Sequence, residues 1–143
     1  MKLRYDLSGT GWAYCTIEIG QATATVTASY LSDALDDLAG AVVGLLCGDE
    51  QSTANFAEEP GEYRWEFARK GSEGVTIRIR FLGSGPDNQP IFEAETRLRT
   101  FAGALLSELQ RLLREHGAAG YKERWVLHDF PERRIDQLKE LLA

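Results

Sequence analysis

The chain contains few of the residue types that usually reveal a chemical function. Its 143 residues include only two cysteines, Cys15 and Cys47, and two histidines. The cysteines lie in a predicted strand and a predicted helix, without the spacing of a zinc site or a redox pair. We therefore expect two free thiols in a reducing compartment, and no metal or other cofactor.

Positive charge is also scarce. Lysine and arginine number 16, against 22 aspartate and glutamate residues, which gives a formal net charge of −6. This balance argues against nucleic-acid binding, because phosphate backbones are bound through lysine and arginine. A nucleic-acid surface, if the protein has one, is expected at the arginines of the predicted sheet, which are Arg64, Arg78, Arg80, Arg97 and Arg99.

Long hydrophobic runs are missing as well. The longest nearly apolar run covers residues 39–47, far short of the ~20 residues that span a bilayer. The first seven residues alternate in polarity like a strand and contain no apolar core of signal-peptide length. We expect a cytoplasmic protein that does not bind membranes.

Alternation of polar and apolar residues is the strongest pattern that is present. Over residues 62–81 it is typical of two strands that are each buried on one face, with aromatic and β-branched side chains on that face. A three-residue hairpin loop then places Trp65 opposite Ile79 on the buried face and Glu66 opposite Arg78 on the outer face. The register is set by burial, because a slip of one residue exposes every aromatic ring.

Two well-patterned helices can cover the buried face. Apolar residues recur at helical spacing over residues 33–47, where Ser32 is the expected N-cap. A second helix is predicted over residues 100–117. We do not begin it earlier, because Arg97 and Arg99 would then lie at the positive end of the helix dipole. A last helix is predicted near the C-terminal end.

Together these elements predict one α+β domain over residues 1–143. Its expected architecture is a single antiparallel sheet of about six strands, in the order ββ-α-ββββ-αα, with the helices packed mainly on one face. The first strand is expected to be broken or bulged at residues 8–11, since Gly9 and Gly11 suit positive φ angles.

Three aspartates near the start of the first predicted helix are a candidate metal site. Asp33 and Asp37 are four residues apart and share a helix face, with Asp36 beside them. Two such carboxylates can hold Mg²⁺ or Ca²⁺, but these ions usually draw further oxygen ligands from loops. Compensation of the helix dipole also explains the three charges, so we expect no metal here.

His128 and Asp129 are the only adjacent acid–base pair. An imidazole beside a carboxylate can act as a general base. Neighbours in sequence seldom orient each other, however, and Asp129 can instead cap the following helix.

The loop after the central hairpin has two superficial motifs. Gly83, Ser84 and Gly85 resemble a phosphate cradle, but a strand follows them, and a strand lacks the dipole that such cradles use. Asp87 and Asn88 lack the remainder of a calcium-binding loop. We expect neither motif to bind its ligand.

Acidic clusters border the first predicted helix on both sides. Solvated surface explains them, and the functional alternative is a face that attracts a partner protein with a basic surface. The candidate binding residues from this reasoning, together with two outward arginines and the acid–base pair, are Asp33, Asp36, Asp37, Glu58, Glu59, Arg78, Arg80, His128 and Asp129.

Three segments resemble a known set of proteins. Residues 59–65 (EPGEYRW), 98–102 (LRTFA) and 124–131 (RWVLHDFP) resemble single-domain proteins of unknown function from actinomycete-type bacteria, over nearly the full length. This resemblance implies no activity and no functional residues. In size and composition alone, the chain is also similar to immunity proteins that block secreted toxins.

The sequence leaves three functions open. The first is a non-enzymatic interaction protein, immunity-like or adaptor-like, that uses an acidic or aromatic surface. The second is a small-molecule-binding or enzymatic domain with a pocket between sheet and helices. The third is a nucleic-acid-binding sheet that uses the outward arginines. Formation of a homodimer is left open.

Overall fold

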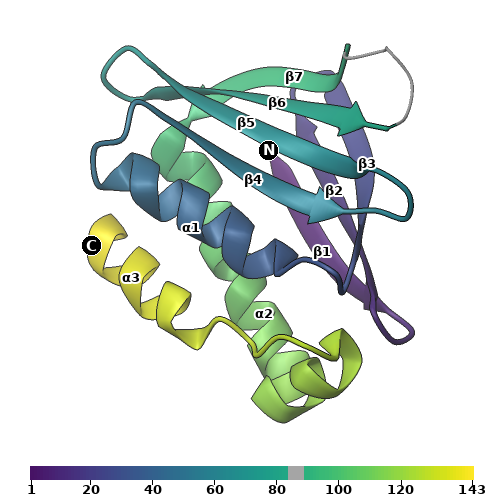
Figure 1. Cartoon of the computed structure of the whole chain (residues 1–143). Helices are drawn as coiled ribbons and strands as arrows, with labels where there is room; N and C mark the ends of the chain where they lie inside the picture. Colours follow the sequence, from purple (N-terminus) through teal and green to yellow (C-terminus); the bar gives the residue numbers. More distant parts are fainter. Residues whose placement is uncertain (84–88) are drawn as a thin grey trace.

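The computed structural model describes residues 1–83 and 89–143 of the chain. Within these residues the chain forms two antiparallel sheets and three helices (Figure 1). The elements are β1 (Lys2–Ser8), β2 (Trp12–Ile19), β3 (Ala22–Ser29), α1 (Ala34–Leu46), β4 (Gln51–Ala57), β5 (Glu62–Lys70), β6 (Gly74–Leu82), β7 (Pro90–Arg97), α2 (Leu98–Trp125) and α3 (Glu132–Leu142).

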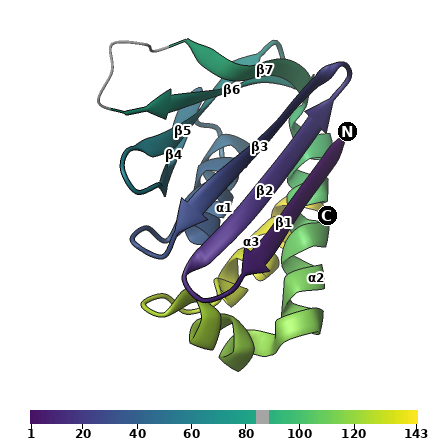
Figure 2. The same ribbon diagram turned by 90° about the vertical axis from the view of Figure 1, so that its right-hand side faces the viewer.

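The α+β class is confirmed, but the single six-stranded sheet was wrong. One sheet has the order β1-β2-β3 and the other β4-β5-β6-β7. The expected break at residues 8–11 is a reversal of the chain: Ser8 pairs with Trp12, and both glycines of this turn have positive φ angles. The strands of the two sheets run in clearly different directions (Figure 2). Strands that cross in this way cannot share one hydrogen-bond ladder.

A line of aromatic rings joins the two sheets. The ring centroids of Tyr5 on β1 and Phe56 on β4 are 6.3 Å apart, and those of Phe56 and Trp65 are 5.4 Å apart. The line continues through Phe67 to Phe101 on α2, at 5.7 Å. Trp65 is completely buried, which confirms the prediction that it faces inward.

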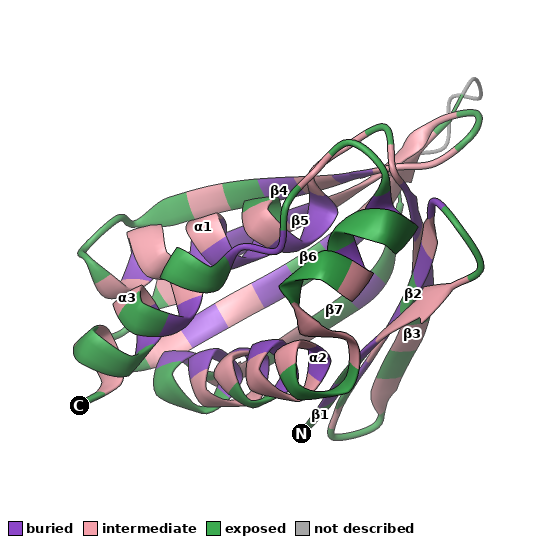
Figure 3. Ribbon diagram, turned by 90° about the horizontal axis from the view of Figure 1, so that it is seen from below, coloured by how far each residue is buried: buried purple, intermediate pink, exposed green. Residues whose placement is uncertain are grey.

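The predicted register of the central hairpin is confirmed. Trp65 pairs with Ile79, and Glu66 pairs with Arg78. The charged side chains of this pair nevertheless bind other partners. Glu66 binds Arg80 diagonally at 2.7 Å, and Arg78 binds Glu93, its direct partner on β7, at 3.1 Å. Burial therefore sets the register, as expected, and the outer charges adapt to it. Along β6, Figure 3 shows buried positions alternating with more accessible ones.

Helix α1 lies beside β4 (Figure 1). Side chains at and just before the start of this helix accept hydrogen bonds from backbone N–H groups on the outer edge of β4. The Oδ2 atom of Asp37 accepts a hydrogen bond from the N–H of Asn55 at 2.8 Å, and the Oγ atom of Ser32 accepts one from the N–H of Ala57 at 2.9 Å. The prediction of Ser32 as N-cap was therefore wrong, because Asp33 occupies that position. The Ser32 hydroxyl instead accepts a hydrogen bond from β4. Covering an edge in this way prevents pairing with a further chain.

Helix α2 covers the outer edge of β1. The carboxylate of Glu108 accepts a hydrogen bond from the N–H of Tyr5 at 2.8 Å, and the guanidinium of Arg111 donates to the carbonyl of Tyr5 at 2.6 Å. The two side chains also bind each other at 2.8 Å. The helix begins at Leu98 and not at residue 100, and its φ/ψ angles are interrupted only at Gly117, where the predicted helix ended.

No helix in the described part of the chain is long and apolar enough to cross a membrane. Both cysteines are free thiols; Cys15 is buried and Cys47 is exposed. Burial raises the pKa of the Cys15 thiol.

Candidate functional site

Four of the nine predicted binding residues line one surface hollow of about 500 Å³. These four, together with the rest of its lining, define the acidic hollow: Asp33, Asp36, Leu127, His128, Asp129, Phe130, Pro131, Glu132 and Arg133. It lies where the start of α1 meets the segment between α2 and α3.

The acid–base pair in the acidic hollow differs from the predicted one. The Nδ1 atom of His128 lies 3.8 Å from the Oδ2 atom of Asp33, whereas Asp129 binds Lys122 at 3.2 Å. Adjacent residues project to different partners here, so tertiary contact and not sequence proximity selects the partner of the imidazole. Burial, reinforced by the charge of Asp36 and opposed by His128, raises the pKa of the Asp33 carboxyl.

The three aspartates of α1 are directed to separate partners. Asp33 faces His128, Asp36 binds Arg134 of α3 at 2.7 Å, and Asp37 binds the backbone of β4. Their carboxylates therefore serve packing contacts, and they do not converge on one point.

The remaining predicted residues lie elsewhere. Glu58 and Glu59 are at the turn between β4 and β5. There a carboxylate oxygen of Glu58 accepts a hydrogen bond from the N–H of Glu59 at 3.2 Å. Arg78 and Arg80 are on the outer sheet face, each beside a glutamate. The two motifs of the loop at 83–88 fall mainly on residues 84–88, which lie outside the described residues.

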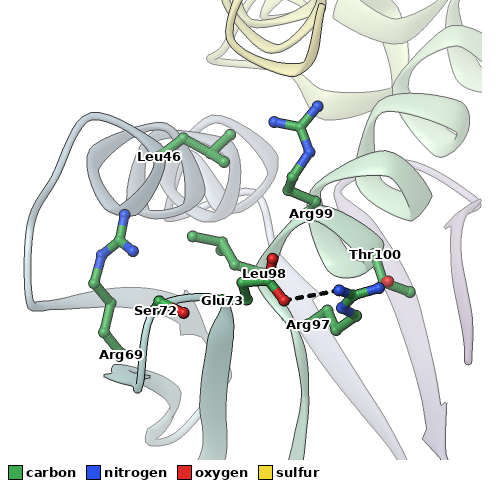
Figure 4. Close-up of a pocket in the computed structure, with 8 residues that line it drawn as sticks. All are labelled: Leu46, Arg69, Ser72, Glu73, Arg97, Leu98, Arg99 and Thr100. Atoms are coloured by element: carbon green, nitrogen blue, oxygen red, sulfur yellow. Dashed lines mark hydrogen bonds and ion pairs between the residues drawn. The ribbon is translucent and has the colours of Figure 1, made fainter.

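A second cavity, of about 480 Å³, contains none of the predicted binding residues. It lies between the end of α1, the β5–β6 loop and the junction of β7 with α2 (Figure 4). We call it the arginine cavity, and its lining consists of Leu46, Arg69, Ser72, Glu73, Arg97, Leu98, Arg99 and Thr100.

The first turn of α2 forms one wall of the arginine cavity. The opening N–H groups of a helix have no partner within the helix and carry partial positive charge. Here Arg97 is the N-cap residue and Arg99 lies in the first turn, which contains no acidic residue, and no side chain caps the helix. The carbonyl of Glu73 accepts a hydrogen bond from the N–H of Leu98 at 2.9 Å. The prediction that these arginines exclude a helix start was wrong.

The three arginines are held in different ways. Arg69 donates to the carbonyl of Leu45 at the end of α1 and to that of Asp49 at 3.1 Å. Arg99 donates to the carbonyl of Leu142 at the end of α3, at 2.6 Å. These two arginines therefore bind backbone carbonyls, and neither has a carboxylate partner among the described residues.

Arg97 alone has an acidic partner in the cavity. Its guanidinium lies 2.7 Å from the Glu73 carboxylate. The hydrogen bond with Glu73 raises the pKa of Arg97, and the same bond lowers the pKa of Glu73. The lining thus carries three positive charges and one negative charge, in a chain whose net charge is −6.

The signal for this cavity was present in the sequence at Arg97 and Arg99, two positive charges beside the start of a strongly patterned helix. It was interpreted as a boundary of the helix. No family model, curated protein or solved structure matches the chain.

Proposed function

We propose that this protein binds a small anionic molecule, such as a carboxylate or a phosphate monoester, in the arginine cavity. The observation that carries the proposal is the placement of Arg97 and Arg99 at the positive end of α2, with Arg69 facing the same cavity. A small-molecule pocket between sheet and helices was one of the three functions that the sequence left open, and this proposal belongs to that class.

Arg97 and Arg99 place positive charge at the positive end of the α2 dipole. Positive side chains at the start of a helix oppose its dipole, and they also repel one another. A bound anion reverses both terms, because it accepts hydrogen bonds from guanidinium groups and from the free N–H groups of the first turn. Departures from local sequence rules are expected at functional sites.

The lining favours binding over catalysis. It contains no histidine and no cysteine, and its hydroxyl groups belong to Ser72 and Thr100. These groups can orient an anion by hydrogen bonds, but the arrangement offers no base beside a nucleophile.

Titration calorimetry at low ionic strength tests the proposal with inorganic phosphate and butyrate as probes. We expect the wild-type protein to bind both, and Arg97→Gln to weaken binding by about tenfold or more, since a hydrogen bond to a charged group contributes about 1.5 to 3 kcal/mol. Arg97 is suited to this test because its side chain is 72% exposed, so its loss disturbs packing little.

Two further variants control that experiment. Glu73→Gln should strengthen binding, because it removes the acid that competes for Arg97. Arg114→Gln makes the same charge change at an exposed position of α2 outside the cavity, and should leave binding nearly unchanged. Absence of binding by both probes, or an equal loss in the Arg97 and Arg114 variants, contradicts the proposal.

The acidic hollow supports a second function, the docking of a partner protein with a basic surface. Such docking corresponds to the immunity-like or adaptor-like protein expected from the sequence. The specific support is that Leu127 is 61% exposed and lines the same hollow as Asp129 and Glu132. An exposed apolar side chain in a hollow with several carboxylates suits a segment that presents leucine between lysines.

A nuclear magnetic resonance titration tests this docking with a short synthetic peptide that alternates lysine and leucine. We expect amide shifts confined to residues 126–133 and the start of α1, and their loss when Asp129 is changed to lysine. A peptide with glutamate in place of lysine is the matched control. Shifts that are absent, or that spread over the whole surface, contradict the proposal.

The nucleic-acid alternative has no comparable support. Arg64, Arg78 and Arg80 each lie beside a glutamate on the outer sheet face. Arg97 and Arg99 line the cavity instead. Formation of a homodimer and a cytoplasmic location stay predictions.

A further inference from the structure

The arginine cavity presents its positive charges at two separate places. Arg69 belongs to β5 and Arg97 to β7, and β6 lies between these strands. Because neighbouring strands are about 4.8 Å apart, the two backbones are separated by roughly 10 Å. Figure 4 shows the two side chains on opposite sides of the cavity, with Leu98, Ser72 and Glu73 between them and Leu46 above.

The cationic groups are also tied to different parts of the fold. Arg69 is tied to the end of α1 and Arg99 to the end of α3 by the carbonyl contacts described above. Each must break these contacts before it can reach across the cavity to share one anion. Each guanidinium has five N–H groups, so donors remain for a ligand after these contacts are made.

We infer that the ligand carries two anionic groups joined by a short apolar chain, as in an aliphatic dicarboxylate. This inference rests on the proposed function of the arginine cavity. One group binds Arg69, and the other binds Arg97 and the start of α2. The side chains of Leu46 and Leu98 suit the apolar chain between them.

The size of the cavity and the physics of linked groups agree with this ligand class. A volume of about 480 Å³ is in the usual range for small-molecule sites. Once one anionic group is bound, the second binds as an intramolecular partner, so affinity depends on how well the chain between them matches the separation of the two positive centres.

Calorimetry with a series of acids tests the inference. The probes are butyrate, succinate, glutarate, adipate and pimelate, at one low ionic strength. We expect affinity to pass through a maximum with chain length, and the best dicarboxylate to bind at least about tenfold more tightly than butyrate. In the Arg69→Gln variant the dicarboxylates should bind no more tightly than butyrate binds to the same variant. The Arg114→Gln variant should show the same maximum of affinity with chain length as the wild-type protein.

Each outcome bears on a different statement. If the dicarboxylates bind no more tightly than butyrate, or their affinity does not vary with chain length, the two-anion inference is overturned and the proposed anion site stands. If neither these acids nor phosphate binds, both are overturned. Should Arg69→Gln fail to fold, the dependence on chain length in the wild-type protein decides alone.

Discussion

Replacing Trp65 with alanine is expected to lower the free energy of unfolding by about 3 to 5 kcal/mol, the usual cost of removing a buried tryptophan or phenylalanine ring. Trp65 is completely buried, and its ring contacts Phe56 on β4 and Phe67 on its own strand. Through these rings it joins the β1–β3 sheet to α2. A cavity at this point therefore loosens the contact between all three layers.

Urea unfolding followed by circular dichroism measures this effect, with Tyr14→Ala as the control. Tyr14 is an aromatic strand residue that is 47% exposed, so its loss should cost about 0.5 kcal/mol or less. Trp65→Phe should cost clearly less than Trp65→Ala, since it retains a ring and removes an indole N–H that is buried without a partner among the described residues. If Trp65→Ala lowers the free energy of unfolding by less than about 1 kcal/mol, the ring of Trp65 is not central to the contact between the sheets and α2.

Replacing Glu108 with alanine is expected to cost about 2 to 4 kcal/mol, because it removes the acceptor of one buried N–H group and one carboxylate of a largely buried guanidinium. The N–H of Tyr5 loses its acceptor. Arg111 loses Glu108 and keeps Glu115 and the carbonyl of Tyr5. The side chains of Glu108 and Arg111 are only 11% and 13% exposed, so water cannot readily replace the lost contacts. The hydrogen bond with Glu108 is also the main reason why the pKa of Arg111 is raised.

Glu115→Ala provides a matched control for that variant. Glu115 binds the same guanidinium at 2.8 Å, but its side chain is 51% exposed, and exposed pairs contribute about 0.2 to 1 kcal/mol. Glu108→Gln should lie between the two, since it retains an acceptor for Tyr5 but not the charge. Equal losses for Glu108→Ala and Glu115→Ala would show that the edge of β1 does not depend on this pair. Thermal or urea unfolding of the three variants supplies the comparison.

The central hairpin could be predicted because its signal is local. Alternation on either side of Trp65 determines the buried face, and a three-residue loop determines which residues are paired, so the pairing of Trp65 with Ile79 followed from nearby residues alone. The two edge contacts could not be predicted. They join Tyr5 to Glu108 and Asn55 to Asp37, and nothing in the sequence relates residues so far apart.

The candidate sites show the same limit. Asp33, Asp36, His128 and Asp129 were expected as binding residues, and the fold does bring them to one hollow. Their individual partners were not predicted, because side-chain direction depends on how α1 and α3 pack. No residue of the arginine cavity was among the nine candidate binding residues, although Arg97 and Arg99 were noticed beside the helix start.

By itself, the sequence determined the α+β class, the strands of the central hairpin, their register and the burial of Trp65, since each follows from polarity repeating over a few neighbouring residues. Only the tertiary structure decided that there are two sheets and that Arg69, Arg97 and Arg99 line one cavity. These features depend on the path of the chain between elements, which brings together residues of α1, β5, β7 and α2. Local patterns of polarity do not specify which distant parts of the chain come together.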